Sequence, residues 1–296
     1  MTTESEQTPR RQPRTYDTSH GPLAFGGRCL VMGVLNVTPD SFSDGGRFLE
    51  LAAALARAKE MAAEGADVID IGGESTRPGS EPVPEDEQIR RVVPVIRELR
   101  ACGVTTPVSI DTRSARVGRA GLDAGADLIN DVSGARRDPI MPDLLAERNV
   151  PFVVMHMRGT PETMQDDPHY GDVVTEVAAF FEDRAEALTA RGVDVDGLMI
   201  VDPGLGFGKT TAHNLALLRS IRSIGPRWPM LVGPSRKRFL GNLLNEPAPD
   251  RRLMGTAAVV AVCALSGVTM VRVHDVRAIR QVVDTCAAIQ DIPAPT

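Results

Sequence analysis

The sequence is poor in the residues that usually build disulfide frameworks, zinc sites and aromatic cores. It has four cysteines in 296 residues, at positions 29, 102, 263 and 286, and no C-x-x-C pair. This spacing is typical of reduced thiols in a cytosolic protein and argues against a disulfide framework or a cysteine zinc site. Aromatic residues make up only 4% of the chain, so the core must consist mainly of Val, Leu, Ile, Ala and Met.

The sequence also lacks a net positive charge and a long apolar stretch, and each absence excludes a class of partner. The net charge is −6, whereas a protein that binds nucleic acid normally carries a basic face. No apolar stretch reaches the ~20 residues needed to span a bilayer. We therefore expect a soluble, cytoplasmic protein with neither nucleic acid nor membrane as partner. Any anion site must be a local concentration of Arg, Lys and backbone amides.

The N-terminal segment differs in composition from the rest of the chain. Residues 1–20 are polar, contain proline and lack an apolar run, so a twin-arginine signal around Arg11 is not expected. Such a segment buries too little surface to offset its ordering entropy. We predict a disordered tail over residues 1–20 and a single domain over residues 21–296.

Eight short β-branched runs alternate with stretches of helical period, for which we predict helices over 50–64, 85–101, 172–191 and 252–266. The runs are CLVMGVLNV, VIDIGG, PVSIDT, LINDVSG, PFVVMH, LMIVDPG, MLVGPS and MVRVHD. Alternation of strand and helix predicts parallel strands with helical crossovers. Eight such units in roughly 250 residues predict an α/β fold, the (β/α)8 TIM barrel. A doubly wound open sheet is the alternative.

The polar residues favour the barrel, because every run ends on one or more of them. These endings are Asn36, Gly72-Gly73-Glu74, Asp111, Asn130, His156, Asp202, Ser235, and Arg272 with His274. A barrel gathers all eight C-terminal strand ends around one mouth, where active sites lie. Asp111, Asn130 and Asp202 each have an alternative interpretation as helix caps. Together they predict a pocket for a flat heterocycle with parallel N–H donors.

Two further segments carry cationic or glycine-rich patterns. DPGLGFGKT, 202–210, matches neither a phosphate-binding loop nor a dinucleotide fingerprint; its glycines permit close backbone approach, and Lys209 is interpreted as a solvated side chain. GPSRKRFLG, 233–241, is either a helix N-terminus that attracts an anion or a solvated basic turn. In VRVHD, 271–275, strand alternation puts Arg272 and His274 on one face, which favours a phosphate site.

The order of these motifs resembles that of one known family. GVLNVTPDSFSDGG, DIGGESTRPGS, SIDT, NDVSG, DPGLGFGKT, SRKRFLG and RVHD resemble, in that order, the dihydropteroate synthases of folate biosynthesis, over residues 28–290. The resemblance implies a pterin-binding (β/α)8 barrel, a homodimer formed through helices near the C-terminus, and a target of sulfonamides. The reaction implied joins 6-hydroxymethyl-7,8-dihydropterin diphosphate to p-aminobenzoate, giving 7,8-dihydropteroate and diphosphate through a pterin methylene cation.

The resemblance also assigns roles to individual residues. The pterin would be held by Asp111, Asn130, Asp202, Lys237 and Met155. The diphosphate would be held by Asn36, Arg77, Arg272 and His274, with Asn36 acting through Mg²⁺, a cation that accepts neutral oxygen ligands and shares substrate phosphates. The p-aminobenzoate would be bound by Phe42, Thr76, Pro78, Phe207 and Ser235. Catalytic roles fall to Asp44, Lys237, Arg272 and His274.

The segment around Asp40 and Asp44, with Gly45 and Gly46 behind it, is predicted to close over the mouth together with residues 75–79. Two departures from the family pattern affect the second substrate. Pro234 stiffens the approach to Ser235, and Arg238 replaces a serine associated with the aminobenzoate carboxylate. Two rivals stay open: a pterin-dependent methyltransferase domain and a non-catalytic paralogue that binds a pterin.

Overall fold

Eight parallel strands form a barrel in the computed structural model, which describes residues 13–37, 46–75, 82–160 and 163–290. The strands are β3 (Leu30–Asn36), β4 (Val68–Gly72), β5 (Val108–Asp111), β6 (Leu128–Asp131), β7 (Phe152–Met155), β8 (Met199–Asp202), β9 (Leu231–Val232) and β10 (Met270–Val273). They are hydrogen-bonded in the order β8-β7-β6-β5-β4-β3-β10-β9. A parallel bridge between Val201 and Met230 joins the two ends. The sheet is therefore closed, which confirms the predicted barrel and excludes the open sheet.

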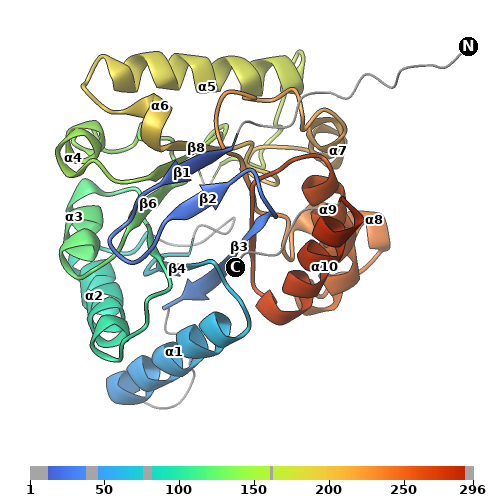
Figure 1. Ribbon diagram of the computed structural model, residues 1–296. Coiled ribbons are helices and arrows are strands. Elements are labelled where there is room, and N and C mark those ends of the chain that lie inside the picture. The colour runs from blue at the N-terminus through green and yellow to red at the C-terminus, as the bar shows by residue number, and fades with distance from the viewer. Residues whose placement is uncertain (1–12, 38–45, 76–81, 161–162, 291–296) are drawn as a thin grey trace, which may run out of the picture.

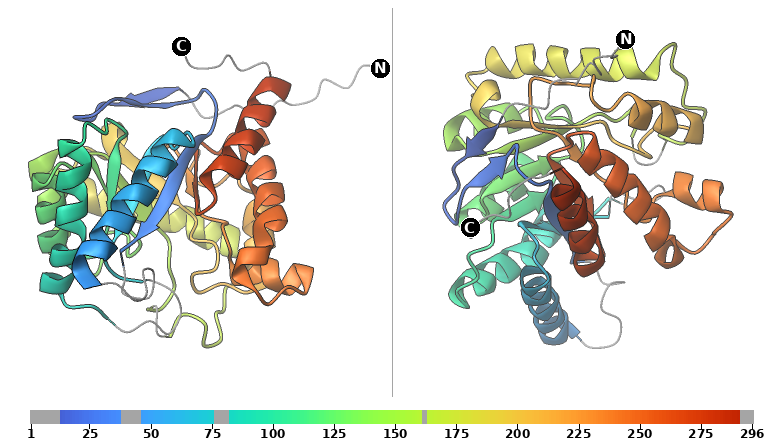
Figure 2. Two further views of the ribbon diagram at one scale, coloured as in Figure 1. Left: turned by 90° about the horizontal axis from the view of Figure 1, so that it is seen from below. Right: turned by 45° about the vertical axis from the view of Figure 1, so that its right-hand side comes forward.

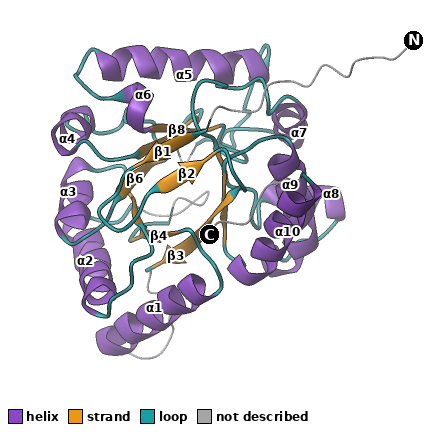
Figure 3. Cartoon of the chain, in the orientation of Figure 1, coloured by secondary structure: helices purple, strands orange, loops and turns teal. Residues whose placement is uncertain are grey.

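Helices surround the barrel as an outer ring (Figures 1 and 3). They are α1 (Gly46–Ala63), α2 (Glu85–Ala101), α3 (Ala115–Asp123), α4 (Met141–Arg148), α5 (Val173–Thr189), α6 (Val195–Leu198), α7 (Thr211–Arg219), α8 (Arg238–Leu244), α9 (Leu253–Leu265) and α10 (Val276–Ile289), with a 3-10 turn at Pro249–Arg252. All four predicted helices are present, with ends shifted by no more than four residues. No helix in the described part of the chain is long and apolar enough to cross a membrane.

Local sequence explains where several helices begin. The first turn of α2 carries Glu85, Asp86 and Glu87, and its last turn carries Arg100, so both ends complement the helix dipole. The hydroxyl of Thr210 accepts a hydrogen bond from the backbone N–H of His213, whose ring accepts one from the N–H of Thr210. This reciprocal cap starts α7 directly after the glycine-rich loop and fixes where that loop ends.

The barrel interior changes from apolar to polar along the strands. The layer of side chains nearer the N-terminal ends of the strands belongs to one apolar cluster. This cluster includes Val68, Leu128, Val153, Ile200 and Met270. Two residues further along, the same strands carry Asp70, Asn130, Met155, Asp202 and Arg272. Because side chains two residues apart in a strand lie on the same face, these residues form the next layer of the interior. The polar layer therefore packs on the apolar cluster, which forms the floor of the barrel.

A short antiparallel hairpin completes this floor. Strand β1 (Arg14–Tyr16) pairs with β2 (Leu23–Phe25), and Tyr16, Leu23 and Phe25 belong to the floor cluster. In Figure 2 the hairpin lies across one end of the barrel. The predicted tail over residues 1–20 is therefore wrong for Arg14–Tyr16. The polar composition of the segment did not reveal that the ring of Tyr16 is buried. The hydroxyl of Tyr16 donates to the carbonyl of Met199 at 3.0 Å.

Two aspartates fasten neighbouring strands at this end. Asp67 accepts hydrogen bonds from the backbone N–H of Val31 and from Arg28 and Arg280. Asp127 accepts from the N–H of Val108 at 2.8 Å. Each aspartate follows a Gly-Ala pair that ends a helix, so the same short motif is used twice.

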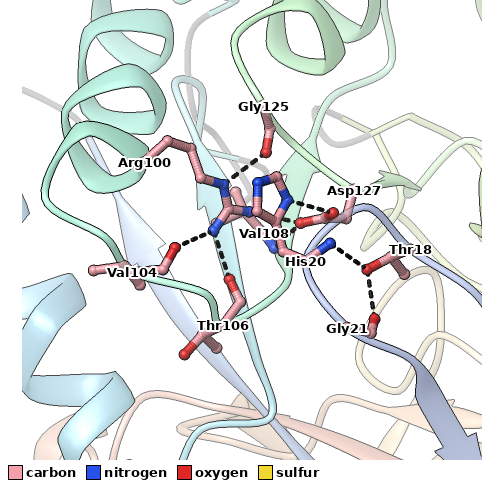
Figure 4. A network of polar contacts seen from close by, with 9 residues as sticks. All are labelled: Thr18, His20, Gly21, Arg100, Val104, Thr106, Val108, Gly125 and Asp127. Carbon is pink, nitrogen blue, oxygen red and sulfur yellow. Dashed lines mark hydrogen bonds and ion pairs between the residues drawn. The ribbon is translucent and has the colours of Figure 1, made fainter.

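Asp127 also connects the hairpin to the barrel (Figure 4). One carboxylate oxygen accepts from Arg100 at 2.6 Å, and the other lies 2.8 Å from Nδ1 of His20. Arg100 also donates to the carbonyls of Val104 and Thr106. The whole network lies at the end of the barrel opposite the predicted mouth.

Candidate active site

A cavity of about 410 Å³ opens at the C-terminal ends of the strands. Most of the predicted site residues that the structure describes line it: Asn36, Asp111, Asn130, Met155, Asp202, Phe207, Ser235, Lys237, Arg272 and His274. They come from seven of the eight strands or the loops that follow them. The prediction that the polar strand ends meet at one mouth is confirmed for these residues. The predicted endings Gly72-Gly73-Glu74 and His156 do not line the cavity: Glu74 pairs with Arg113 and His156 with Lys209.

Arg272 occupies the centre of the polar layer. Its Nε donates to Asp70 at 2.6 Å and its Nη2 donates to Asp111 at 2.7 Å. The amide of Asn130 donates to the same oxygen of Asp70 at 3.1 Å. The other oxygen of Asp70 is buried without a hydrogen-bond partner in the described structure. Four strands are therefore cross-linked by one guanidinium, two carboxylates and one amide.

Burial sets the protonation of the two cavity carboxylates. It raises the pKa of Asp111 to about 7, although the positive charge of Arg272 acts in the opposite direction. Burial also raises the pKa of Asp202, against a hydrogen bond from the N–H of Gly204 at 2.7 Å. Near neutral pH both protonation states of Asp111 are therefore populated, and a buried carboxyl with a strongly raised pKa in a cavity is a feature of functional sites.

The glycine-rich loop, residues 203–209, lies flat against the end of β7. A Cβ on Gly204 would overlap the carbonyl oxygen of His156, and a Cβ on Gly208 would overlap that of Arg158. Both glycines have positive φ, 65° and 62°, which other residues rarely adopt. The prediction of a solvated Lys209 is wrong, since its side chain is buried among these backbones with 3% exposure.

Phe207 and Lys237 meet at one wall of the cavity. The ammonium nitrogen of Lys237 lies 3.9 Å from the centroid of the Phe207 ring, a cation–π contact. Phe207 packs on a small apolar cluster that contains Met155 and Met164. Lys237 and Met155, predicted for the pterin, therefore share one wall with Phe207, predicted for the aminobenzoate. The charge of Lys237 also acts against the burial that raises the pKa of Asp202.

Ser235 and His274 form a pair on the adjacent wall. The hydroxyl of Ser235 lies 2.9 Å from Nδ1 of His274 and accepts from its backbone N–H at 3.2 Å. Arg272 and His274 line the same cavity, as strand alternation predicts. Arg236 also lines the cavity and donates to Asp275 at 2.9 Å, so its guanidinium is engaged in an ion pair at the edge of the site.

Seven residues named from the sequence, for the site or for the segment predicted to close over it, lie outside the described residues: Asp40, Phe42, Asp44, Gly45, Thr76, Arg77 and Pro78. Their roles stay predictions.

Three residues at the site were not predicted from the sequence: Asp70, Arg252 and Gln165. Asp70 lies in the middle of the apolar run VIDIGG, where period-two alternation with Val68 is the signal that would have located it. Arg252 is buried beneath the cavity wall and donates to the carbonyl of Arg236 at 3.0 Å. Gln165 lines the cavity and donates to the carbonyl of Gly206 at 2.8 Å. No local pattern distinguishes the last two from surface residues.

Fold and site together define a class: a (β/α)8 barrel whose mouth offers acceptors suited to a flat polar heterocycle beside donors suited to an anion. Comparison with known proteins is specific. The family model described as pterin binding enzyme matches residues 32–274, and the chain belongs to this family.

Several similar proteins are named dihydropteroate synthase. The chain is 49% identical over 255 residues to the dihydropteroate synthase of Mycobacterium leprae, covering 84% of this chain and 89% of the relative. It is 44% identical over 268 residues to that of Synechocystis, covering 90% and 91%. A Xanthomonas albilineans dihydropteroate synthase solved with 4-aminobenzoic acid superposes with a TM-score of 0.88 at 43% identity, covering 95% of this chain and all of the other. The same enzyme solved with 7,8-dihydropteroate gives a TM-score of 0.80 at 42% identity, with 90% and 95% covered.

Proposed function

We propose that the chain catalyses the dihydropteroate synthase reaction of folate biosynthesis. It joins 6-hydroxymethyl-7,8-dihydropterin diphosphate to p-aminobenzoate and releases 7,8-dihydropteroate and diphosphate. The observation that carries this proposal is the meeting of Asp111, Asn130 and Asp202 with Arg272 and His274 in one cavity. The first three offer acceptors for a heterocycle, and the last two offer donors for an anion.

The pterin ring would lie on the polar layer. A pterin presents adjacent N–H donors along one edge, and a carboxylate accepts two parallel N–H donors well. Asp202 already accepts one hydrogen bond from Gly204, which fixes its plane before the substrate arrives. Lys237 and Met155 would complete the pocket. Ligand donors would satisfy acceptors that are otherwise costly to bury.

The C–O bond to the diphosphate then breaks, and its electron pair leaves with the diphosphate. Arg272 uses Nε and Nη2 in its two ion pairs, so Nη1 takes part in neither and is available to an incoming oxygen. His274 would donate to the same anion. Charge stabilisation at a pre-organised site of this kind is the largest common contribution to catalysis.

The residues around Asn36 fit a Mg²⁺ ion only in part. Among residues 13–37, 46–75, 82–160 and 163–290 there is no cluster of three His, Cys, Asp or Glu side chains that would hold a metal alone. Asn36 offers one neutral oxygen beside the anion-binding residues, a donor set suited to Mg²⁺ that keeps waters and shares substrate phosphates. Bound there, Mg²⁺ would neutralise charge on the departing diphosphate.

The second substrate would enter over Phe207 and Ser235. Its amine nitrogen attacks the pterin methylene carbon, a C–N bond forms, and the amine loses a proton to solvent or diphosphate. An arylamine is neutral near pH 7, so no strong base is needed. Asp44 would stabilise the cation or orient the arylamine, Phe42, Thr76 and Pro78 would wall the ring, and Arg77 would meet the diphosphate.

We also propose a cytoplasmic homodimer. Of the seven large hydrophobic side chains exposed among the described residues, six lie on α8, α9 and α10, which gather on one side of the barrel (Figure 2). On α9, Met254 (79% exposed), Val262 (50%) and Leu265 (36%) fall on one helical face. An apolar patch of this kind marks an interface, and a second copy of the chain is the occupant we propose.

The function is tested by measuring diphosphate release from the dihydropterin substrate with Mg²⁺, in the presence and absence of p-aminobenzoate. We expect release that depends on p-aminobenzoate in the wild type and collapses in Asp44→Ala, while pterin binding measured by calorimetry survives. A wild type that binds pterin but never releases diphosphate would be a non-catalytic paralogue. Methyl transfer without diphosphate release would indicate the methyltransferase rival.

A further inference from the structure

One buried lysine near the cavity has no part in the proposed chemistry. Burial lowers the pKa of Lys209 to about 7, although the charge of Asp202 acts in the opposite direction. Lys209 is 3% exposed, and its ammonium nitrogen lies within hydrogen-bonding distance of three acceptors. These are Nδ1 of His156 at 2.9 Å, the carbonyl of His156 at 3.3 Å and the carbonyl of Phe207 at 3.0 Å. In its charged form the lysine has three hydrogens and no acceptor, so the three contacts use all of its hydrogens within the protein.

The contact with His156 fixes the state of that ring. Nδ1 can accept a hydrogen bond only when the proton of the neutral ring is on Nε2. Burial, with help from the charge of Lys209, lowers the pKa of His156 to about 2, in keeping with a neutral acceptor. The ring is also held edge-on to Phe180, with centroids 4.9 Å apart. Lys209 thus donates to a His156 ring whose position is itself fixed by packing against Phe180.

Other residues fasten the glycine-rich loop on either side of Phe207. Gly206 donates to Asn214 at 2.8 Å and accepts from Gln165 at 2.8 Å. The hydroxyl of Tyr170 donates to the carbonyl of Gly208 at 2.8 Å. The carbonyl of Phe207 is the remaining one in this stretch, and Lys209 is its side-chain donor. Each of three consecutive residues is therefore held by a different side chain.

Phe207 transmits this constraint to the site. Its ring lies 3.9 Å from the ammonium of Lys237, which is proposed to contact the pterin. Displacement of the Phe207 backbone would move both the wall for the second substrate and the support for Lys237. A misplacement of about 1 Å in such a contact reduces turnover by as much as about a hundredfold.

We propose that Lys209 is a positioning residue of this enzyme, which fixes Phe207 against His156 and through Phe207 fixes Lys237. The inference rests on the proposed function and deepens it. A buried ammonium is a costly way to fill a core, and an apolar side chain of similar length would pack at lower cost. The specific gain from Lys209 is a donor directed at the backbone of the loop that carries Phe207.

The test is a double-substitution cycle between Lys209→Met and Phe207→Leu. We expect Lys209→Met to raise the KM for p-aminobenzoate by about tenfold or more and to lower kcat. The reason is that the substitution displaces both Phe207 and Lys237. In the Phe207→Leu background the same substitution should change KM less than twofold, because two residues that act through one contact are not additive. Equal effects in both backgrounds would overturn the proposal.

Tyr170→Phe is the matched control, because it removes the donor to the neighbouring carbonyl of Gly208 without touching Phe207. It should lower the unfolding temperature while leaving the KM for p-aminobenzoate unchanged. If Lys209→Met does not fold, Lys209→Gln, which keeps donor hydrogens, should fold and show an intermediate KM. Failure of both to fold would show that Lys209 maintains the fold itself and would overturn the proposal. An inactive wild type would instead refute the proposed function.

Discussion

Nη2 of Arg272 lies 2.7 Å from Oδ2 of Asp111, although the two residues are 161 positions apart in the sequence. The same guanidinium binds Asp70, which is completely buried. One cation thus compensates two carboxylates inside the barrel. The pair is at once part of the proposed site and part of what holds β4, β5 and β10 in register, so its stability and its activity are linked.

Loss of this cation should be costly. Arg272→Met leaves two buried carboxylates uncompensated, and breaking a buried ion pair from one side costs about 3–5 kcal/mol. We expect the free energy of unfolding in urea to fall by about that amount and diphosphate release to be lost. Arg116→Met is the control: its ion pair with Asp86 is on the surface and is worth at most about 1 kcal/mol. Equal losses in the two variants would contradict a compensating role for Arg272.

The protonation of Asp111 should appear in the pH dependence of stability. Its pKa is about 7 in the folded protein and about 3.9 in an unfolded chain, so between these values the folded state holds more protons. The stability contributed by the protonated carboxyl is present below about pH 4 and is lost as pH rises through about 7. Asp111→Asn removes the titrating group.

Urea unfolding should therefore show a smaller decline between about pH 5 and about pH 8 in Asp111→Asn than in the wild type. An unchanged slope would mean that Asp111 does not titrate in this range. The decline that remains in the variant would report other buried carboxylates, among them Asp202, whose pKa burial also raises.

Much of this architecture was predictable because it depends on local pattern. Runs with β-branched residues ended in polar groups, and parallel strands in a barrel bring such ends together whatever the distance in sequence. Asp111, Asn130, Asp202 and Arg272 were found in this way. Their pairing was not predictable, because period-two alternation places a side chain in the barrel interior but does not say which neighbour it will contact.

The errors have physical causes of the same kind. Lys209 follows three glycines in the loop after β8. Its burial depends on His156, which directly follows β7. Residues 14–16 are a strand because Tyr16 closes the apolar floor, a contact that composition does not reveal. Period-two alternation with Val68 could have placed Asp70 in the barrel interior, but its pairing with Arg272, which is 202 residues away, could not be predicted. Long-range pairing decides each case, whereas local sequence decides helix ends and strand ends.

The fastening of the barrel floor should affect stability without affecting the mouth. Asp127→Ala removes acceptors for Arg100, His20 and the N–H of Val108, and we expect a loss of about 3–5 kcal/mol. KM values should stay unchanged at temperatures where the variant is folded, since the network lies at the far end of the barrel. Asp123→Ala, which removes a surface partner of Arg148, should cost at most about 1 kcal/mol. Altered KM values in Asp127→Ala would mean that the floor and the mouth are coupled.

The proposed dimer predicts a monomer when the apolar face of α9 is charged. Met254→Asp combined with Val262→Asp places two carboxylates on exposed positions of that face, where desolvation and mutual repulsion oppose association. Sedimentation velocity should show a dimer for the wild type and a monomer for the double variant. Ile140→Asp, at an exposed hydrophobic residue on another surface, should stay dimeric. A wild type that sediments as a monomer would refute the dimer.

The last prediction concerns the departure at position 238. Ser235, one of the residues predicted to bind p-aminobenzoate, already pairs with His274 through its hydroxyl. Arg238 lines the cavity, and its exposed guanidinium forms no hydrogen bond or ion pair with another described residue. Arg238 is therefore the cation best placed to attract the carboxylate. Because an exposed charge pair is worth about 0.2–1 kcal/mol, Arg238→Met should raise the KM for p-aminobenzoate by about fivefold at most.

The effect should have the salt dependence of a screened charge. Raising the ionic strength to about 1 M shortens the Debye length to about 3 Å, so the KM of the wild type should approach that of Arg238→Met, while the KM for the pterin substrate changes less. Arg219→Met, a substitution on α7 outside the cavity lining, should leave both constants unchanged. If neither salt nor Arg238→Met alters the KM for p-aminobenzoate, the carboxylate must be bound by Ser235 and the start of α8. In that case the arginine at position 238 has no part in substrate binding.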